Sequence, residues 1–299
     1  AVPILWVGQD PVERIATLEA ISVSEPPLVE MPLQMNPQVE RWVDAFQTAR
    51  RPEFEDLLRR RTLYAEMIQG KLREREMPQE LLYISVIESG LSPHAVSHVS
   101  AVGLWQFMSP TALQYGLRVD EYVDERRDPV RATDAALDYL AYLHARFGGS
   151  WYLAAAAFNA GPGRLERVLV RHAGGLPVSG DDDLYWEVVE HLPRETREYV
   201  PKMVAVSMLA NDADELGFDS SGHEPYRFDN VFVPGGTTLE SVADALEIHV
   251  RALRDLNPHL MRGITPPGEI YGVRIPIGES ATVVNALAET IPLRKTDDD

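Results

Sequence analysis

The sequence predicts a mainly α-helical protein that carries a small α+β module near its C-terminal end. The first observation is the helical spacing of apolar residues over 38–216, where strand-like alternation is nearly absent. The second is a change of pattern near residue 217, after which two short alternating runs flank two helical runs. The third is the composition, with 45% hydrophobic and 25% charged residues, which is typical of a folded globular chain.

The charge and cysteine content exclude several classes of function. Acidic residues number 46 and basic residues 28, and the net charge of −18 argues against nonspecific binding of nucleic acid or anionic membranes. The absence of Cys excludes a disulfide framework, a thiolate nucleophile and a Cys-ligated metal site. No apolar run reaches the roughly 18 residues of a membrane span. Because the chain begins at Ala1 rather than Met, we expect a trimmed N-terminus from which a targeting segment has been removed.

Four parts are expected along the chain. Prolines are frequent before residue 38, where Val12–Ile21 is a short helix-compatible stretch, so this part is interpreted as an arm. The polar end Lys295–Asp299 is expected to be frayed. The parts are an arm at 1–37, a helical domain at 38–216, a small module at 217–283 and a tail at 284–299.

Apolar periodicity and helix-boundary residues predict the individual elements. Pro78 and Pro162 suit helix starts, and the pairs Gly148-Gly149 and Gly174-Gly175 suit helix ends. The predicted helices of the main domain cover about 38–49, 53–75, 79–89, 109–115, 131–147, 150–158, 162–171 and 194–211. The module is predicted as a strand at 228–233, helices at 238–246 and 249–256, and a strand at 273–277.

Glu88 is the first candidate for chemistry. Its helix, from Leu81 onward, is apolar on almost every face, which is typical of a buried helix, and it ends at Glu88-Ser89-Gly90. Such a carboxylate either caps a backbone or pairs with an Arg, or it is a general acid whose pKa is raised by desolvation. From the residues alone both interpretations stay open.

Two later segments combine apolar surfaces with amides. Gly103 precedes Trp105, Gln106, Phe107 and Met108, a mixture of the kind that binds sugars, although a core loop with an incidental Gln is the alternative. A helix rich in Ala runs into a second such segment, Phe158-Asn159-Ala160-Gly161, where Asn159 is expected at a helix end with an exposed amide. The plain alternative for this second segment is an ordinary turn.

Several ordered blocks resemble one enzyme family. The segments IESGLSPHAVSHVSAVGLWQFMSPTA, FNAGPG and ETREYVPKM resemble the lytic murein transglycosylases of the soluble-lytic type, which have a goose-type lysozyme-like fold. The flanking pieces YVDERRDPVRAT and RFGGSWYLA are similar to a membrane-bound branch of that family. The resemblance covers about 38–216. Residues 228–278 resemble a degenerate LysM-type glycan-binding module, through VPGGTTLESVADAL and LRDLNPHL.

The resemblance implies which residues act. It makes Glu88 the single catalytic acid/base and Tyr199 the tyrosine that faces it. Phe158 departs from the family's tyrosine, so a hydroxyl is missing there. The residues that the resemblance places along the substrate are Ser97, Gln106, Met108, Phe158, Asn159 and Tyr199.

The implied reaction cleaves the β-1,4 bond between N-acetylmuramic acid and N-acetylglucosamine in peptidoglycan. Protonated Glu88 donates to the glycosidic oxygen, and the resulting carboxylate then takes the proton of the muramyl 6-hydroxyl. That oxygen attacks C1 and closes a 1,6-anhydro ring, so the substrate supplies the nucleophile that a second carboxylate supports in other glycosidases. No metal or cofactor is implied. Peptidoglycan strands are the expected partner, nucleic acid is not, and a monomer in the periplasm or attached to the outer membrane is expected.

Alternatives remain at this stage. A goose-type lysozyme would hydrolyse the same bond, with Asp120, Glu121, Asp124 or Glu125 positioning a water. A non-catalytic peptidoglycan-binding protein is a further alternative, and residues 228–278 could be a structural clamp that binds no glycan.

Two groups of residues have part, but not all, of a metal-binding pattern. His94 and His98 have the i, i+4 spacing of helix metal ligands, but Ala95 stands where zinc proteases need Glu. The acidic run Asp181–Asp183 lacks the spacing of an EF-hand and is interpreted as a solvated loop.

Overall fold

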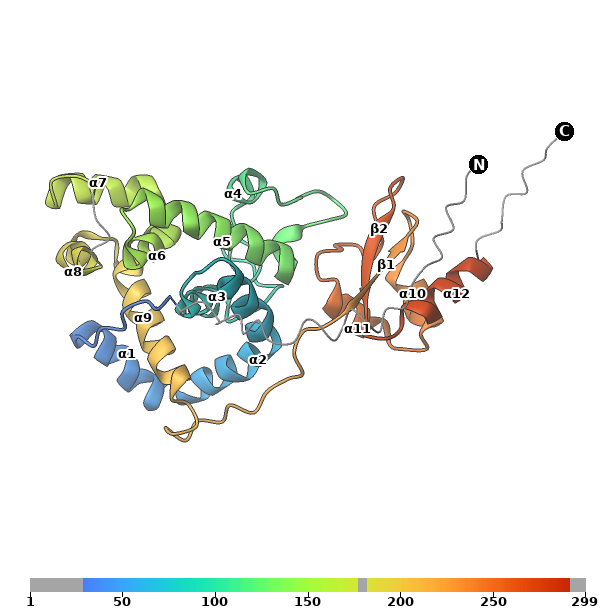
Figure 1. Cartoon of the computed structure of the whole chain (residues 1–299), viewed down its shortest axis with the longest axis horizontal. Helices are drawn as coiled ribbons and strands as arrows, with labels where there is room; N and C mark the ends of the chain where they lie inside the picture. Colours follow the sequence, from blue (N-terminus) through green and yellow to red (C-terminus); the bar gives the residue numbers. More distant parts are fainter. Residues whose placement is uncertain (1–28, 177–181, 291–299) are drawn as a thin grey trace, which may run out of the picture.

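The computed structural model describes residues 29–176 and 182–290 and places them in two bodies (Figure 1). The regular elements of the larger body are all helices in the described ranges, and this body holds the hydrophobic core that runs from Met31 to Phe218. The smaller body contains two strands and three helices around its own core. The mainly helical class predicted from the sequence, with an α+β module after it, is therefore confirmed. The predicted arm helix at 12–21 and the frayed end at 295–299 lie outside the described residues.

The helical body is built from nine α-helices in its described ranges, joined by short 3₁₀ turns. Side chains cap several helix starts: Asn36 accepts from the N–H groups of Gln38 and Val39 at 3.0 Å, and Asp128 accepts from Val130 and Arg131. The helices are α1 (Pro37–Gln47), α2 (Arg51–Glu74), α3 (Leu82–Ser89), α4 (Ser109–Gln114), α5 (Pro129–Arg146), α6 (Trp151–Ala160), α7 (Pro162–His172), α8 (Asp183–Val188) and α9 (Arg194–Asn211). The 3₁₀ turns are η2 (Gln79–Leu81), η3 (Glu125–Arg127) and η4 (Val189–His191).

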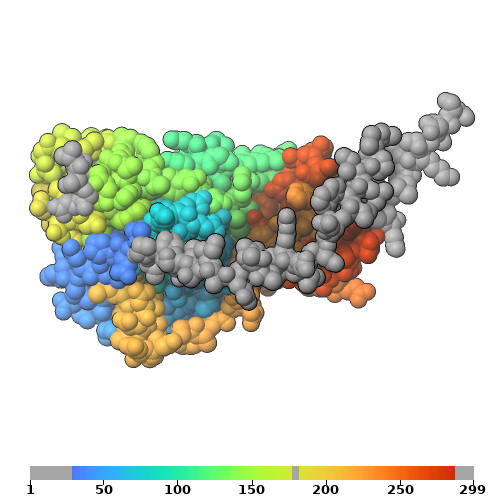
Figure 2. Space-filling model, in the orientation of Figure 1, coloured from blue at the N-terminus to red at the C-terminus, as the bar shows by residue number. Residues whose placement is uncertain are grey.

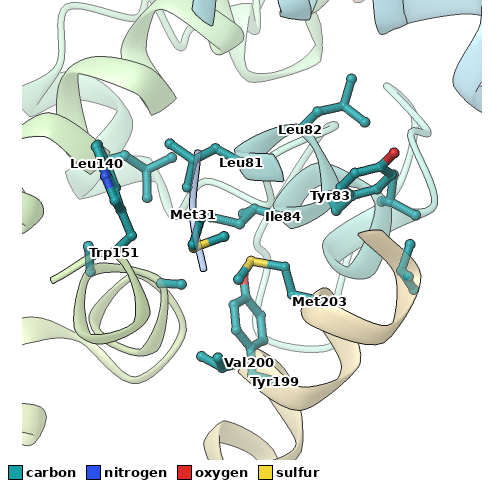
Figure 3. Packing of buried hydrophobic residues seen from close by; sticks show 14 of the residues in the cluster. Met31, Leu81, Leu82, Tyr83, Ile84, Leu140, Trp151, Tyr199, Val200 and Met203 are labelled. Atoms are coloured by element: carbon teal, nitrogen blue, oxygen red, sulfur yellow. The ribbon is translucent and has the colours of Figure 1, made fainter. Parts of the chain in front are cut away.

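The short helix α3 lies in the middle of this body and packs against α2 and α9. Five of its eight residues are buried, from Leu82 to Val86, as the apolar sequence predicts. Figure 3 shows Ile84 of α3 beside Tyr199, Val200 and Met203 of α9, which meet in one apolar cluster. Helix α3 is thereby held against α9.

The module consists of an antiparallel pair, β1 (Asp229–Val233) and β2 (Tyr271–Ile275), and the helices α10 (Leu239–Ala245), α11 (Val250–Leu256) and α12 (Ser280–Thr290). Its core contains Val231, Val273 and Ile275 from the strands and Val242 and Leu253 from the helices. The predicted order strand–helix–helix–strand is confirmed.

Three details of the elements differ from the sequence predictions. Strand β2 begins and ends two residues before the predicted 273–277, because Pro276 has no N–H to pair and Ile277 is exposed. Helix α8 was not predicted, since its six residues are too few to show a period. Helix α12 was not predicted either, and it buries Val283 in the module core, so residues from both the predicted module and the predicted tail form it. The four-part division of the chain stays a prediction.

The two bodies meet at a junction with both apolar and polar contacts, and Val123 of the helical body is buried in the core of the module. Val123 of the helical body pairs with Leu260 of the module in an isolated antiparallel bridge, and the Asp124 N–H donates to the His259 carbonyl at 2.9 Å. Arg274 on β2 forms a buried ion pair with Asp128, with Nη2 2.7 and 2.8 Å from its two oxygens. In the space-filling view the module, coloured red, lies directly against the green segments of the helical body (Figure 2). None of the helices in the described ranges is both long and apolar enough to cross a membrane.

Candidate active site

Glu88 occupies the last turn of α3, where burial and a tight helix end determine its position. Gly90 ends the helix in the left-handed conformation with φ 61°, and a side chain there would meet Arg60 at 2.8 Å. Ser89 donates to the Leu104 carbonyl at 2.8 Å and so ties the helix end to the following loop. Glu88 itself is partly buried. A carboxyl group is thus presented at the edge of the core rather than in open solvent.

Tyr199 contacts Glu88 directly. Its hydroxyl donates to Glu88 Oε1 at 2.7 Å across 111 residues of sequence. Burial, followed by the charge of Glu88, raises the pKa of Tyr199 well above its ordinary value, so the phenol keeps its proton and remains a donor. The two residues that the sequence predicted to face each other therefore do so.

The surroundings of Glu88 raise its pKa to about 7. Burial is the largest cause, and the negative charge of Glu195 acts in the same direction. The hydrogen bond from Tyr199 and the positive charge of Lys202 oppose the rise without cancelling it. A carboxyl group with a pKa near neutrality can donate a proton and take one back at physiological pH.

The loop after α3 folds back beside Glu88 because of Gly103. This residue has φ 85°, and a Cβ there would lie 1.7 Å from the carbonyl oxygen of Arg126. Trp105, fully buried, donates from its indole to Thr133 on α5 at 3.0 Å. Arg126 lies under the loop and donates to the carbonyls of Ser100 and Phe107, while it pairs with Asp124. The loop is therefore held from inside the helical body.

The predicted residues of this loop have different surroundings. Ser97 Oγ accepts from the N–H groups of Val99 and Ala101, so it closes the loop and has a structural part there. Gln106 has φ 49° and donates from Nε2 to the Gly103 carbonyl at 2.9 Å, which orients its side chain. No described residue hydrogen-bonds its Oε1. Met108 is 42% exposed and offers an apolar surface at the start of α4.

The end of α6 adds an aromatic and an amide group. Phe158 packs edge-on against Trp105 and Phe107, with ring centroids 6.5 and 6.3 Å apart, and it lies 5.4 Å from the ring of Tyr139. Asn159 Oδ1 accepts from Thr196 at 2.8 Å, and its Nδ2 donates to Glu195 at 3.3 Å. The expected exposed amide is therefore bound to α9, one turn before Tyr199.

Sequence reasoning missed four residues of this arrangement. Glu195 and Lys202 act electrostatically on Glu88, Thr196 holds Asn159, and Tyr139 packs on Phe158. Glu195 and Lys202 lie four residues before and three after Tyr199, so helical spacing around a predicted site tyrosine was the available signal. Tyr139 had no such signal in the sequence.

The four acids that the lysozyme alternative would use to position a water form hydrogen bonds or ion pairs with other residues. Asp124 pairs with Arg126 at 2.8 Å, and Glu121 pairs with Arg262 of the module at 3.0 Å. Asp120 accepts from Arg118, and Glu125 accepts from the Arg118 N–H at 2.7 Å. All four lie at the segment that contacts the module.

The histidines and acids weighed as metal ligands do not gather. No group of three or more His, Asp or Glu residues that could hold a metal ion is found in the described ranges. Asp182 accepts from the Ser150 hydroxyl and the Tyr152 N–H, so it caps α6 and is not the solvated residue that was expected. Asp181 lies outside the described residues.

Comparison with known proteins gives two family matches and several relatives. Residues 66–174 match the family model "Transglycosylase SLT domain", and residues 227–290 match "Lytic transglycosylase MltD, LysM-like domain". Membrane-bound lytic murein transglycosylase D of Escherichia coli K12 is 33% identical over 203 residues, which are 68% of this chain and 44% of that protein. Soluble lytic murein transglycosylase of the same strain is 30% identical over 148 residues, 48% of this chain and 22% of that protein. The crystal structure of the 70 kDa soluble lytic transglycosylase of Escherichia coli has 26% sequence identity and a TM-score of 0.44, covering 62% of this chain and 30% of that one. The chain thus spans less than half the length of these relatives.

Proposed function

We propose that this protein, which carries a transglycosylase SLT domain and a LysM-like domain of the lytic transglycosylase MltD family, is a peptidoglycan lytic transglycosylase. Its substrate is the β-1,4 bond between N-acetylmuramic acid and N-acetylglucosamine, and its product carries a 1,6-anhydro end. The hydrogen bond between Tyr199 and Glu88, in surroundings that raise the pKa of Glu88 to about 7, is the observation that carries the proposal.

In the first step protonated Glu88 gives its proton to the glycosidic oxygen while the bond to C1 breaks. This bond cleavage passes through an oxocarbenium-like transition state on the muramyl ring. In the second step the Glu88 carboxylate takes the proton of the 6-hydroxyl, and that oxygen bonds to C1. The donated proton leaves with the departing sugar, and the proton of the 6-hydroxyl restores the acid form of Glu88, so one carboxyl group is enough. A pKa near 7 suits both directions of transfer.

The remaining predicted residues are assigned to substrate contact in this proposal. Met108 offers the sugars an apolar surface, and Gln106 Oε1 is the acceptor that its own loop leaves available. Phe158 contributes a ring, and Asn159, which Thr196 and Glu195 hold against α9, contributes the N–H that these contacts leave over. Ser97 acts mainly by closing the loop, so its contribution to binding is expected to be smaller than theirs.

Replacing Glu88 by Gln separates an enzyme from a protein that only binds the cell wall. We expect E88Q to keep binding to purified sacculi and to release no soluble fragments. Glu80 offers a matched control, because burial raises the pKa of this carboxyl as well and it precedes Glu88 by two helical turns. E80Q should release fragments at nearly the wild-type rate. Unchanged release by E88Q would contradict the assignment.

The second candidate reaction is hydrolysis of the lysozyme type, and one structural observation favours it. Glu195 lies near enough to Glu88 to raise its pKa, so a second carboxylate is present beside the first. Its contact with Asn159 Nδ2 at 3.3 Å leaves lone pairs that could orient a water. Product analysis distinguishes the two reactions.

Two further assignments belong to the proposal. Peptidoglycan lies outside the cytoplasmic membrane, so a location in the periplasm or at the outer membrane follows from the substrate. The module is proposed to hold a fixed position relative to the helical body, because the contacts between them include the buried ion pair Arg274–Asp128. We expect the protein to act as a monomer without a metal or cofactor.

A further inference from the structure

The geometry points to a second binding site, a cationic pocket between the helical body and the module that takes a carboxylate of the substrate's peptide stem. This inference rests on the proposed function, because it takes the substrate to be peptidoglycan. The site is separate from Glu88 and concerns the peptide rather than the glycan. The pocket has a volume of about 420 Å³, within the usual range for ligand sites.

The lining of this pocket has an unusual charge for such an acidic chain. Its wall contains three arginines and a histidine and no Asp or Glu, whereas the whole chain has a net charge of −18. His94 and Arg127 come from the helical body, and Arg254 and Arg262 come from the module. An anion approaching the surface is therefore repelled by most of the chain and attracted here.

Arg127 has little compensation for its charge. The carboxylate of Asp124 lies 3.9 Å away and is already paired through both oxygens with Arg126 at 2.8 Å. Among the described residues Arg127 Nε has no hydrogen-bond partner, and Nη1 reaches only the His94 carbonyl at 3.4 Å. Burial and the nearby Arg127 charge hold the pKa of His94 below its ordinary value. A bound carboxylate would relieve this repulsion.

The two module arginines are held in place from outside the pocket. Arg254 pairs with Glu240 at 2.5 Å, and Arg262 pairs with Glu121 at 3.0 Å while it lies over the ring of Tyr122. Each contact uses one nitrogen of a guanidinium that carries five N–H donors, so others remain for a ligand. Such forks bind carboxylates with two parallel hydrogen bonds.

The walls of the pocket are fixed relative to each other before any ligand binds. The Val123–Leu260 bridge and the Met261 N–H, which donates to the Tyr122 carbonyl at 2.9 Å, join the two bodies directly at the pocket. The pocket is also connected to the candidate active site. His94 belongs to the loop that contains Gln106, and the next residue, Ala95, accepts from Gln106 Nε2 at 3.4 Å.

Peptidoglycan supplies the matching ligand. Its sugars are linked in a chain, and every muramyl unit can carry a peptide whose free carboxylates are negative at neutral pH. The stem is thus the anionic part of the substrate. A pocket that takes one of its carboxylates would favour strands with free stems over strands whose stems are amidated or removed.

The test measures peptide binding in E88Q, so that turnover has no part in it. The probe is a soluble muropeptide with free stem carboxylates, and its amidated counterpart is the comparison, each titrated by calorimetry. We expect R127M and R254M to raise Kd at least fivefold for the free acid and to leave the amidated peptide unchanged. Arg251 lies on the same helix as Arg254, is 83% exposed and is not in the pocket wall, so R251M is the control and should stay within twofold.

Three results would overturn the inference. Equal affinity for the free-acid and amidated peptides would remove the carboxylate from recognition. An equal loss in R251M would show that only the general charge matters. Tighter binding of inorganic phosphate than of the free-acid peptide would assign the pocket to a phosphate ligand. Thermal unfolding of each variant checks that the pocket is still formed, and R254M tests the site even if R127M unfolds, because Arg254 is largely exposed. If the wild-type protein binds the free-acid peptide but releases no fragments from sacculi, that result contradicts the proposed function and leaves the binding site standing.

Discussion

The hydroxyl of Tyr199 donates to Glu88 Oε1 at 2.7 Å and joins the end of α3 to α9, a helix that is far away in sequence. The contact lies at the edge of the core, where α3 and α9 pack together. It stabilises the carboxylate more than the protonated acid, because a hydrogen bond to a charged acceptor is the stronger one. The hydrogen bond therefore orients Glu88 and lowers its pKa against the larger effect of burial.

Replacing Tyr199 by Phe should shift the pH dependence upward. The hydrogen bond lowers the pKa of Glu88, so its loss leaves burial less opposed and raises that pKa above about 7. The alkaline limb of kcat/KM should move to higher pH, and the maximal rate should fall roughly tenfold or more, because the carboxyl is no longer oriented. A pH–rate profile on a soluble glycan substrate measures both. An unchanged limb would mean that Tyr199 does not act on Glu88.

Replacing Glu195 and replacing Lys202 should shift the pH dependence in opposite directions. Glu195 raises the pKa of Glu88 and Lys202 lowers it. E195Q, which keeps an acceptor for Asn159, should move the alkaline limb to lower pH, and K202M should move it to higher pH. Shifts of the same sign in the two variants would contradict the electrostatic account. Complete loss of activity in E195Q with normal folding would instead favour a second essential carboxylate.

The difference in stability between the wild type and E88Q should depend on pH in a defined direction. In the unfolded chain Glu88 ionises near 4.5, whereas in the folded protein it ionises near 7. Between these values the unfolded chain has lost the proton first, so the wild type loses up to about 3 kcal/mol of unfolding free energy as pH rises through this window. Gln does not titrate, so E88Q should gain stability relative to wild type at pH 8 and not at pH 4. Denaturant unfolding at both pH values measures the difference, and an equal effect at both would disprove the burial of the acid.

The buried pair between Asp128 and Arg274 should couple the module to the helical body. Burial would raise the pKa of Asp128, but Arg274, His259 and a backbone hydrogen bond from Arg131 together outweigh it and hold the pKa below its ordinary value. R274M leaves a buried carboxylate unpaired and should lower the unfolding free energy by about 3–5 kcal/mol. D128N keeps the helix cap and leaves the guanidinium unpaired. The double variant D128N/R274M should lose less than the sum of the two, and strict additivity would contradict the coupling.

The sequence was sufficient for the parts of the fold that repeat a strong pattern. Helix α3 was predicted because its residues are apolar on nearly every face, and Glu88 stood out because it ends that helix. The contact with Tyr199 was expected only through the family resemblance. No local pattern in the chain brings two residues 111 positions apart together.

Other features could not be read from the sequence for physical reasons. Strand β2 was misplaced by two residues, since alternation alone did not show that Gly272 lies opposite Phe232 and that Pro276 ends the ladder. The charges of Glu195 and Lys202 act on Glu88 only once α9 packs on α3. The cationic pocket is formed by residues from both bodies, so no single segment of the sequence predicts it.

Mass spectrometry of the fragments released from purified sacculi tests the central claim most directly. The proposed mechanism predicts muropeptides that are lighter by one water than the hydrolytic products, because the 6-hydroxyl has closed the anhydro ring. These fragments should be absent with E88Q and present with E80Q. Fragments with an ordinary reducing end would contradict the account, and they would show that water, rather than the substrate's own hydroxyl, attacks the muramyl carbon.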